Sequence, residues 1–144
     1  MRTIGEILAS KRLREVVSVE AGDTVLEAVR HMDEANTGAV VVLEQGRLVG
    51  IFTERDLMRR VVLEGRDVST TGVSEVMTRE LLFSEPDKAG EEAMSKMTRH
   101  RCRHLPVVEG ERLVGVISIG DLMKEISDEQ SVEIHFLKEY IYSR

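Results

Sequence analysis

Tryptophan is absent from this sequence, aromatic residues make up only 3% of it, and its single cysteine is Cys102. One cysteine can form neither an internal disulfide nor a cysteine-based zinc site, so packing alone must hold the fold together. The scarcity of aromatics leaves few platforms for stacking bases, and a net charge of −6 opposes a general affinity for nucleic acid. No apolar run approaches the ~18 residues of a membrane span, and the amino terminus lacks the apolar stretch of a signal peptide. We therefore expect a cytoplasmic protein that binds neither nucleic acid nor a membrane.

Proline is also scarce, with two residues in 144, whereas hydrophobic residues make up 42% and charged residues 32% of the chain. This composition is typical of a folded globular protein and not of a disordered one. A chain of this length suffices for one compact domain or for two small lobes that share a core. Two fully independent domains are not expected.

An internal repeat spans most of the chain. The segment RLVGIFTERDLMRRV begins at Arg47 and RLVGVISIGDLMKEI begins at Arg112, so the offset is 112 − 47 = 65 residues. The same register continues backwards without a gap as far as Glu20 and Glu85. Each unit therefore covers about 45 residues, and every residue inside it must be interpreted together with its counterpart.

The hydrophobic pattern predicts the order strand, helix, strand, strand, helix in each unit. In the first unit, Thr24 and Glu27 form a capping-box signature ahead of apolar residues at helical spacing, and two later apolar runs joined by a tight polar connection predict a hairpin. The expected elements of the first unit are a strand at 16–19, a helix after Thr24, strands at 39–43 and 47–52, and a helix from Thr53 to near Gly65. Those of the second unit are 81–84, about 88–101, 104–108, 112–117 and 118–126.

The units at 16–65 and 81–126 should form an α/β (α+β) fold of two tandem β-α-β-β-α repeats. A three-stranded sheet with helices on one face cannot bury both faces alone, so we expect the repeats to pack sheet to sheet about a pseudo-twofold axis. A polar linker at 66–80 joins them, and a helical segment at 1–15 precedes them.

The tail at 127–144 carries a second capping-box signature, Ser127 with Gln130, and is expected to form its own short helix. Its apolar residues Ile134, Leu137 and Ile141 fall on one helical stripe. Such a stripe needs a surface to cover, so we expect a homodimer.

The junction between the last strand and the last helix has the same form in both units: Gly, two apolar residues, a hydroxyl residue, two residues, Asp. The hydroxyl residue and the aspartate are Thr53 and Asp56 in the first unit, and Ser118 and Asp121 in the second. A helix N-cap with an acidic first turn would account for one such junction. Alternatively, the free N–H groups of the helix start can hold a phosphate, while the carboxylate accepts both hydroxyls of a ribose. That second arrangement is what a nucleotide requires.

Two units of this order, each with this junction, resemble cystathionine-β-synthase-type (CBS) repeats paired in a Bateman module. The resemblance covers residues 16–126, and the phrases RCRHLPVVEGERLVGVISIGDLMK and TTGVSEVMT are similar to those of small stand-alone bacterial CBS-pair proteins. It implies that Asp56 and Asp121 hold ribose and that Thr53 and Ser118 approach ribose or phosphate.

In that family each site also borrows from the first turn of the other repeat. The resemblance therefore implies Thr24 for the site built on Asp121, and Lys88 for the site built on Asp56.

A basic segment precedes the central strand of the second unit, where the resemblance implies phosphate-binding cations. Its candidate residues are Arg101, Arg103 and His104, and Arg55 supplies a cation to the first site. A helix end whose cations oppose the negative pole of the helix dipole is the alternative. The fold itself does not demand these charges, because the corresponding residues of the first unit are the uncharged Asn36, Gly38 and Ala39. We expect the site with Ser118, Asp121, Thr24 and this segment to depend on ligand phosphate more than the site with Thr53, Asp56 and Lys88.

Metal binding and catalysis are not expected. His100 and His104 have the spacing of two ligands on one helix face, yet no acidic or cysteine partner is placed beside them. Cys102 belongs to no marked nucleophile–base constellation, and a semi-buried thiol is the favoured interpretation.

The expected function is a non-catalytic regulatory module that binds an adenine nucleotide, with AMP as the first choice and ADP, ATP or NAD as the others. A ligand that bridges two repeats favours the arrangement with more contacts, which is how binding could become a signal to a protein target that the sequence does not identify. Two alternatives stay open: a nucleotide-hydrolysing enzyme, which would need a metal-binding carboxylate cluster or an activated nucleophile, and a structural dimerisation module with non-functional sites.

Overall fold

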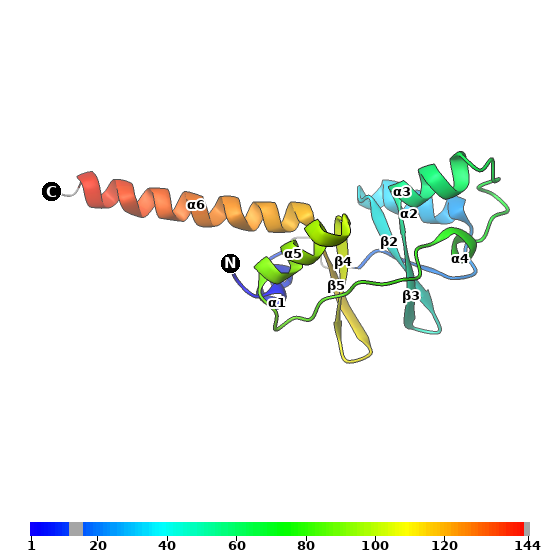
Figure 1. Cartoon of the computed structure of the whole chain (residues 1–144), viewed down its shortest axis with the longest axis horizontal. Coiled ribbons are helices and arrows are strands. Elements are labelled where there is room, and N and C mark those ends of the chain that lie inside the picture. Colours follow the sequence, from blue (N-terminus) through cyan, green and yellow to red (C-terminus); the bar gives the residue numbers. More distant parts are fainter. Residues whose placement is uncertain (12–15, 143–144) are drawn as a thin grey trace.

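The computed structural model describes residues 1–11 and 16–142 and contains two small sheets with helices around them (Figure 1). In chain order the elements are α1 (Ile4–Ala9), β1 (Ser18–Glu20), α2 (Val25–Ala35), β2 (Ala39–Glu44), β3 (Arg47–Thr53), α3 (Glu54–Asp56), the π-helix η1 (Leu57–Val62), α4 (Val73–Val76), α5 (Gly90–His100), β4 (His104–Glu109), β5 (Arg112–Ser118) and α6 (Ile119–Tyr142). The parts of the expected terminal helices at 12–15 and 143–144 lie outside the described residues.

The first repeat has the predicted three-stranded sheet, in the order β1-β2-β3. β1 pairs with β2 in parallel, and β2 with β3 as an antiparallel hairpin. The side chain of Thr24 accepts a hydrogen bond from Glu27 N and so caps α2, as the capping-box signature predicted. Apolar residues of α2, η1 and the sheet form one core, which includes Val25, Ala28, Met32, Val40, Val42, Phe52 and Val61.

The second repeat repeats the hairpin, as β4 and β5, but the strand expected at 81–84 is reduced to one bridge between Ser84 and Val107. Proline explains the difference. In the first repeat Val41 N donates to Val17 O, which ties the incoming segment to β2. The residue 65 positions later is Pro106, which has no N–H to donate, so the equivalent hydrogen bond cannot form.

The last helix differs from the prediction because it does not stop at the end of the repeat. α6 runs without interruption from Ile119 to Tyr142, so the expected helix start at Ser127 is wrong. A serine is tolerated inside a helix, and no glycine or proline occurs between Asp121 and Tyr142 to break it. Figure 1 shows α6 projecting well beyond the rest of the molecule.

Two short helices from outside the repeated units complete the two cores. α1 packs on β5 and α5 of the second repeat, and α4 packs on β3 and η1 of the first. Their side chains cover the same glycine of the repeat: a Cβ on Gly115 would lie 3.0 Å from Leu8 Cδ1, and one on Gly50 would overlap Met77 Sδ. The segments that follow α1 and α4 are therefore delivered to equivalent places, one to each Asp junction.

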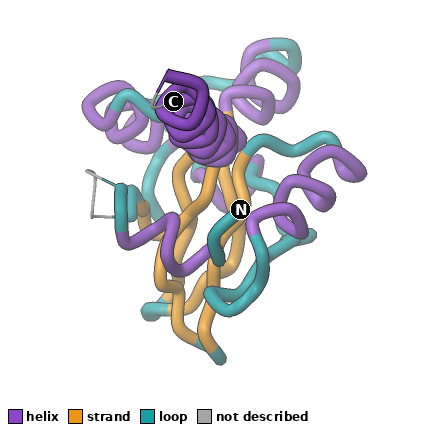
Figure 2. Tube along the Cα trace, turned by 90° about the vertical axis from the view of Figure 1, so that its left-hand side faces the viewer, coloured by secondary structure: helices purple, strands orange, loops and turns teal. Residues whose placement is uncertain are grey.

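The repeats meet through their strands, because β3 and β5 are in contact. Viewed along α6, the strands lie together in the centre of the molecule, with helices above them and on both sides (Figure 2). The α/β architecture predicted from the sequence is confirmed in outline.

Candidate functional site

A cleft of about 580 Å³ lies between the two repeats, within the range of small-molecule sites. The second repeat contributes His104, β5 and the start of α6, and the first contributes the connection from α2 to β2. Much of its wall is apolar, and its polar lining residues are Lys11, Asn36, Thr37, His104, Ser118 and Asp121. The structure thus places three of the predicted site residues, His104, Ser118 and Asp121, in one cleft.

Ser118 and Asp121 hold each other in a reciprocal cap at the start of α6. Ser118 N donates to Asp121 Oδ2 at 2.8 Å, and Asp121 N donates to Ser118 Oγ at 3.1 Å. The helix-capping interpretation is therefore correct for this junction. This cap uses only Oδ2 of the carboxylate, and Oδ1 of Asp121 has no hydrogen-bond partner within the described chain.

Lys11 enters the same cleft, and sequence reasoning missed it. Its Nζ lies 2.8 Å from Asp121 Oδ2 and donates to Val116 O at 3.0 Å. The packing of α1 on β5 through Leu8 and Gly115 carries the residue there. A signal existed in the sequence: IGEIL at Ile4 and VSEVM at Val73 share one pattern at an offset of 73 − 4 = 69 residues, outside the 65-residue register.

His104 lies opposite Ser118 in the β4–β5 register and is partly buried in the cleft wall. Burial lowers its pKa below the ordinary 6.5, and the charge of Asp121 opposes that effect only in part. The imidazole is therefore neutral at pH 7, and Lys11 is the cation that the described lining residues bring into the cleft.

The junction of the first repeat has the same cap but a different environment. Asp56 Oδ2 accepts from Thr53 N at 3.1 Å and from the Thr53 hydroxyl at 3.2 Å. The Thr78 hydroxyl donates to both carboxylate oxygens, at 3.0 Å and 3.2 Å, and Arg60 Nε lies 3.8 Å from Oδ1. Asp56 is only 6% exposed, and both of its oxygens are already engaged by the protein.

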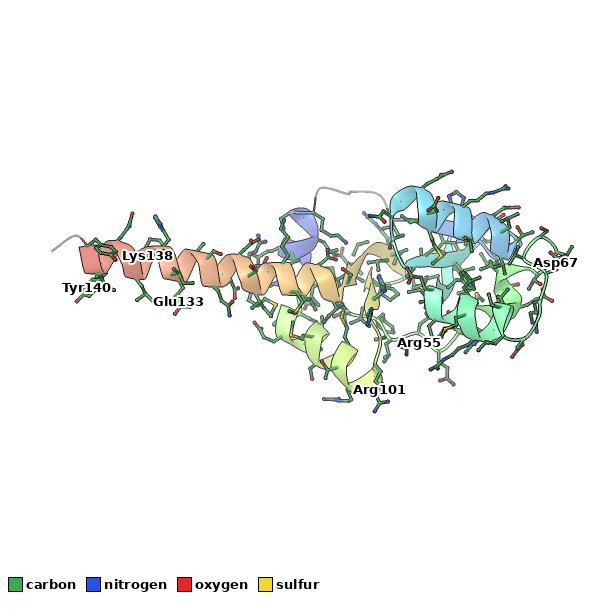
Figure 3. The ribbon with its side chains drawn as sticks, turned by 90° about the horizontal axis from the view of Figure 1, so that it is seen from above. Arg55, Asp67, Arg101, Glu133, Lys138 and Tyr140 are labelled. Carbon is green, nitrogen blue, oxygen red and sulfur yellow. The ribbon has the colours of Figure 1, made fainter. Side chains whose placement is uncertain are left out.

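The three candidate residues of the basic segment have different surroundings, and only His104 lines the cleft. Arg101 ends α5 with a positive φ of 54°, and its carbonyl accepts a hydrogen bond from Arg55 Nη1 at 3.5 Å. This contact places Arg101 beside Arg55, the neighbour of Asp56, and not in the cleft at Asp121 where the sequence predicts it. Figure 3 shows Arg55 and Arg101 where the two repeats meet. The side chain of Arg103 is exposed and does not line the cleft.

The two residues predicted from the opposite repeats have other contacts. Thr24 caps α2 and forms a bridge with Gly72 of the linker. Lys88 accepts a hydrogen bond from Ile4 N at its carbonyl and so holds α1. Neither residue lines the cleft at Asp121.

Two further properties concern the described part of the chain as a whole. It contains no group of three or more His, Cys, Asp or Glu residues placed to hold a metal ion. None of its helices combines the length and the apolar character that crossing a membrane would require.

Comparison with known proteins identifies relatives for nearly the whole chain. The family model described as CBS domain matches residues 4–63 and 73–128. The CBS domain-containing protein YhcV of Bacillus subtilis is 40% identical over 118 residues, which are 81% of this chain and 84% of that protein. The mitochondrial CBS domain-containing protein CBSX3 of Arabidopsis thaliana is 40% identical over 124 residues, and the chain spans only 60% of its length. A solved structure of a protein with CBS domains from Burkholderia ambifaria superposes with a TM-score of 0.86 at 41% identity, covering 90% of this chain and 96% of the other.

Proposed function

The chain belongs to the CBS-domain family, and on that premise we propose that it is a regulatory module that binds an adenine nucleotide in the cleft at Asp121. The observation that carries the proposal is the incomplete use of this carboxylate. Asp121 is held in place by Ser118 at the start of α6, yet its Oδ1 has no partner among the described residues. A positioned carboxylate with a free oxygen at a cleft is suited to accept the hydroxyls of a ribose.

The rest of the cleft fits the other parts of a nucleotide. Apolar residues such as Val16, Val114 and Val116 offer a surface for a flat base, and the hydroxyls of Thr37 and Ser118 can bond to ribose or phosphate. We take AMP as the first candidate, because one phosphate would meet the single ammonium of Lys11. ADP, ATP and NAD are alternative ligands that the same titration compares.

We further propose that each chain holds one nucleotide and not two. Asp56 would have to release Thr78, from the linker, before a ribose could reach its oxygens. Removing a buried hydrogen bond costs about 1–3 kcal/mol. Asp121 differs from Asp56 because its contacts with Ser118 and Lys11 involve only Oδ2 and leave Oδ1 without a partner among the described residues. Arg55 and Arg101 then act at the surface of the first junction and not on this ligand.

The role we propose is binding without catalysis. Hydrolysis of a nucleotide needs a metal held by several carboxylates or an activated nucleophile. The cleft brings one carboxylate, Asp121, together with a neutral imidazole and hydroxyl groups. Incubation with ATP and Mg²⁺ should therefore leave ATP intact, and the appearance of ADP or AMP would favour the enzyme alternative.

We propose that the active form is a homodimer with α6 in the interface, and that a separate protein target reads its state. The outer half of α6 exposes Val132, Ile134, Phe136, Leu137, Tyr140 and Ile141 by half or more of their surface. Figure 3 shows Glu133, Lys138 and Tyr140 along this projecting part of the helix. A second copy packed against this part of α6 would bury these apolar side chains, which would otherwise be exposed to water.

Native mass spectrometry of the purified chain, followed by calorimetric titration with AMP, ADP, ATP and NAD, tests these proposals together. We expect one nucleotide per chain and a mass of two chains. If none of the four ligands binds, the proposed binding of an adenine nucleotide is overturned, and the alternative of a structural dimerisation module is favoured.

A further inference from the structure

Lys11 bridges two acceptors on the wall of the cleft. Its ammonium is held by the Asp121 carboxylate at 2.8 Å and by the Val116 carbonyl at 3.0 Å. The side chains of Lys11 and Asp121 are 28% and 19% exposed, so the pair is partly withdrawn from water. At this exposure solvent and salt screen the interaction between the two charges less than they screen a fully exposed pair.

A ribose and Lys11 compete for the same carboxylate. Asp121 Oδ2 already accepts from Ser118 N and from Lys11, so a diol that engages both carboxylate oxygens must weaken or displace the lysine contact. The displaced ammonium would keep only the neutral carbonyl of Val116. Among the described lining residues no other carboxylate can replace Asp121, and His104 is neutral.

A ligand that brings its own anion removes this penalty. A phosphate group can pair with the ammonium that the ribose has released, whereas a neutral nucleoside leaves it without a counter-charge in a partly dehydrated cleft. We propose that Lys11, a residue outside the repeated units, is the specificity-determining residue of this cleft, which makes it select phosphorylated nucleosides over the nucleosides themselves. This inference rests on the proposed function, and it differs from the expectation that Arg101 or Arg103 carries the phosphate.

The test compares AMP with adenosine by calorimetric titration of the parent, Lys11→Met and Lys124→Met. Methionine keeps an unbranched apolar stem but removes the charge, and Lys124 is an exposed lysine of α6 that does not line the cleft. We expect the parent and Lys124→Met to bind AMP at least about tenfold more tightly than adenosine, as one charge-assisted contact would give. In Lys11→Met this ratio should fall to about one or two, and adenosine should bind as tightly as to the parent or more tightly, because Asp121 is released.

Several outcomes would overturn the inference. If AMP binds but its preference over adenosine survives in Lys11→Met, another group carries the phosphate, and Arg103→Ala would identify one candidate. If the parent binds both ligands equally, the cleft does not select phosphate at all. If neither AMP nor adenosine binds the parent, the inference fails, and the titration with ADP, ATP and NAD decides whether the proposed function fails as well.

A second measurement tests the contact without any ligand. Thermal unfolding of Lys11→Met, Asp121→Asn and the double variant forms a double-mutant cycle. Coupling between the two substitutions is expected from the ion pair. Additive effects would mean that the contact does not exist in solution, and would overturn the inference even if nucleotides bind.

Discussion

The hydroxyl of Thr78 donates to both carboxylate oxygens of Asp56, at 3.0 Å and 3.2 Å. Thr78 belongs to the linker, and two backbone hydrogen bonds with Ile51 fix it against β3. The linker thus closes the junction of the first repeat in the place where Lys11 enters the junction of the second. Two junctions with the same sequence form therefore have different chemistry because the segments delivered to them differ.

Thr78→Val should lower the free energy of unfolding by about 1–2 kcal/mol, because it removes a hydroxyl donor from a buried carboxylate while preserving shape. Thr70→Val in the same linker is the control, since Thr70 is exposed, and should change stability by less than about 0.5 kcal/mol. Denaturant unfolding of both variants is the measurement. Equal stability of the two would mean that Thr78 does not hold Asp56.

Asp56→Asn should reduce mainly the stability of the protein, whereas Asp121→Asn should reduce mainly its affinity for AMP. At Asp56 the amide would face a hydroxyl and an N–H that now donate to it, so we expect a loss of about 1–3 kcal/mol of stability and AMP affinity within about twofold of the parent. At Asp121 we expect AMP affinity to fall about tenfold or more. Titration and unfolding of both variants decide the matter, and a tenfold loss of affinity in Asp56→Asn would show that the first junction also binds ligand.

Stability should decrease as pH falls below about 6.5, in part because of His104. Burial lowers the pKa of this imidazole in the folded state, so below 6.5 the unfolded chain binds more protons than the folded one. His104→Gln should therefore have a smaller fall in melting temperature between pH 7.5 and pH 5.5 than the parent. His135→Gln, at an exposed position of α6, is the control and should keep the slope of the parent. An unchanged slope in His104→Gln would mean that another group causes the pH dependence.

If the protein is the homodimer proposed above, Leu137→Lys should convert it into a monomer, because the substitution places a charge in the apolar face of α6. Leu63→Lys is a matched control, since Leu63 is 74% exposed at the end of η1, more than the 55% of Leu137. Sedimentation equilibrium of the parent and of Leu63→Lys should give twice the chain mass of 16.2 kDa, and that of Leu137→Lys the chain mass alone. A dimer that persists in Leu137→Lys would place the interface elsewhere.

Local patterns sufficed to predict most of the fold. The hairpins follow from apolar runs joined by a tight polar connection, and α2 follows from Thr24 and Glu27 at the head of an amphipathic stripe. The missing strand at 81–84 depended on one residue, Pro106, whose lost donor acts on a partner more than twenty positions away. The continuous α6 shows that a capping-box signature at Ser127 cannot start a helix where the preceding residues already form one.

The candidate site was predicted only in part, because some of its contacts are made by segments that are distant in the sequence and are brought together by tertiary packing. Ser118 and Asp121 carry a local signature, and the reciprocal cap follows from it. Lys11 reaches Asp121 through the packing of Leu8 on Gly115. The pattern shared by IGEIL and VSEVM indicates two related helices, but it does not say which residue after the first helix reaches Asp121. For the same reason Asp56 and Asp121 are equivalent in the sequence, while the structure gives them different partners.

The unbroken α6 gives the module a long lever. Its 24 residues extend over about 36 Å, and Asp121 lies in its first turn while Tyr142 is its last residue. A rigid rod of that length converts a change of about 10° in its angle at the base into a movement of about 6 Å at the tip. A small rotation of α6 at the carboxylate would therefore become a large displacement at the far end of the helix, where its exposed apolar residues lie.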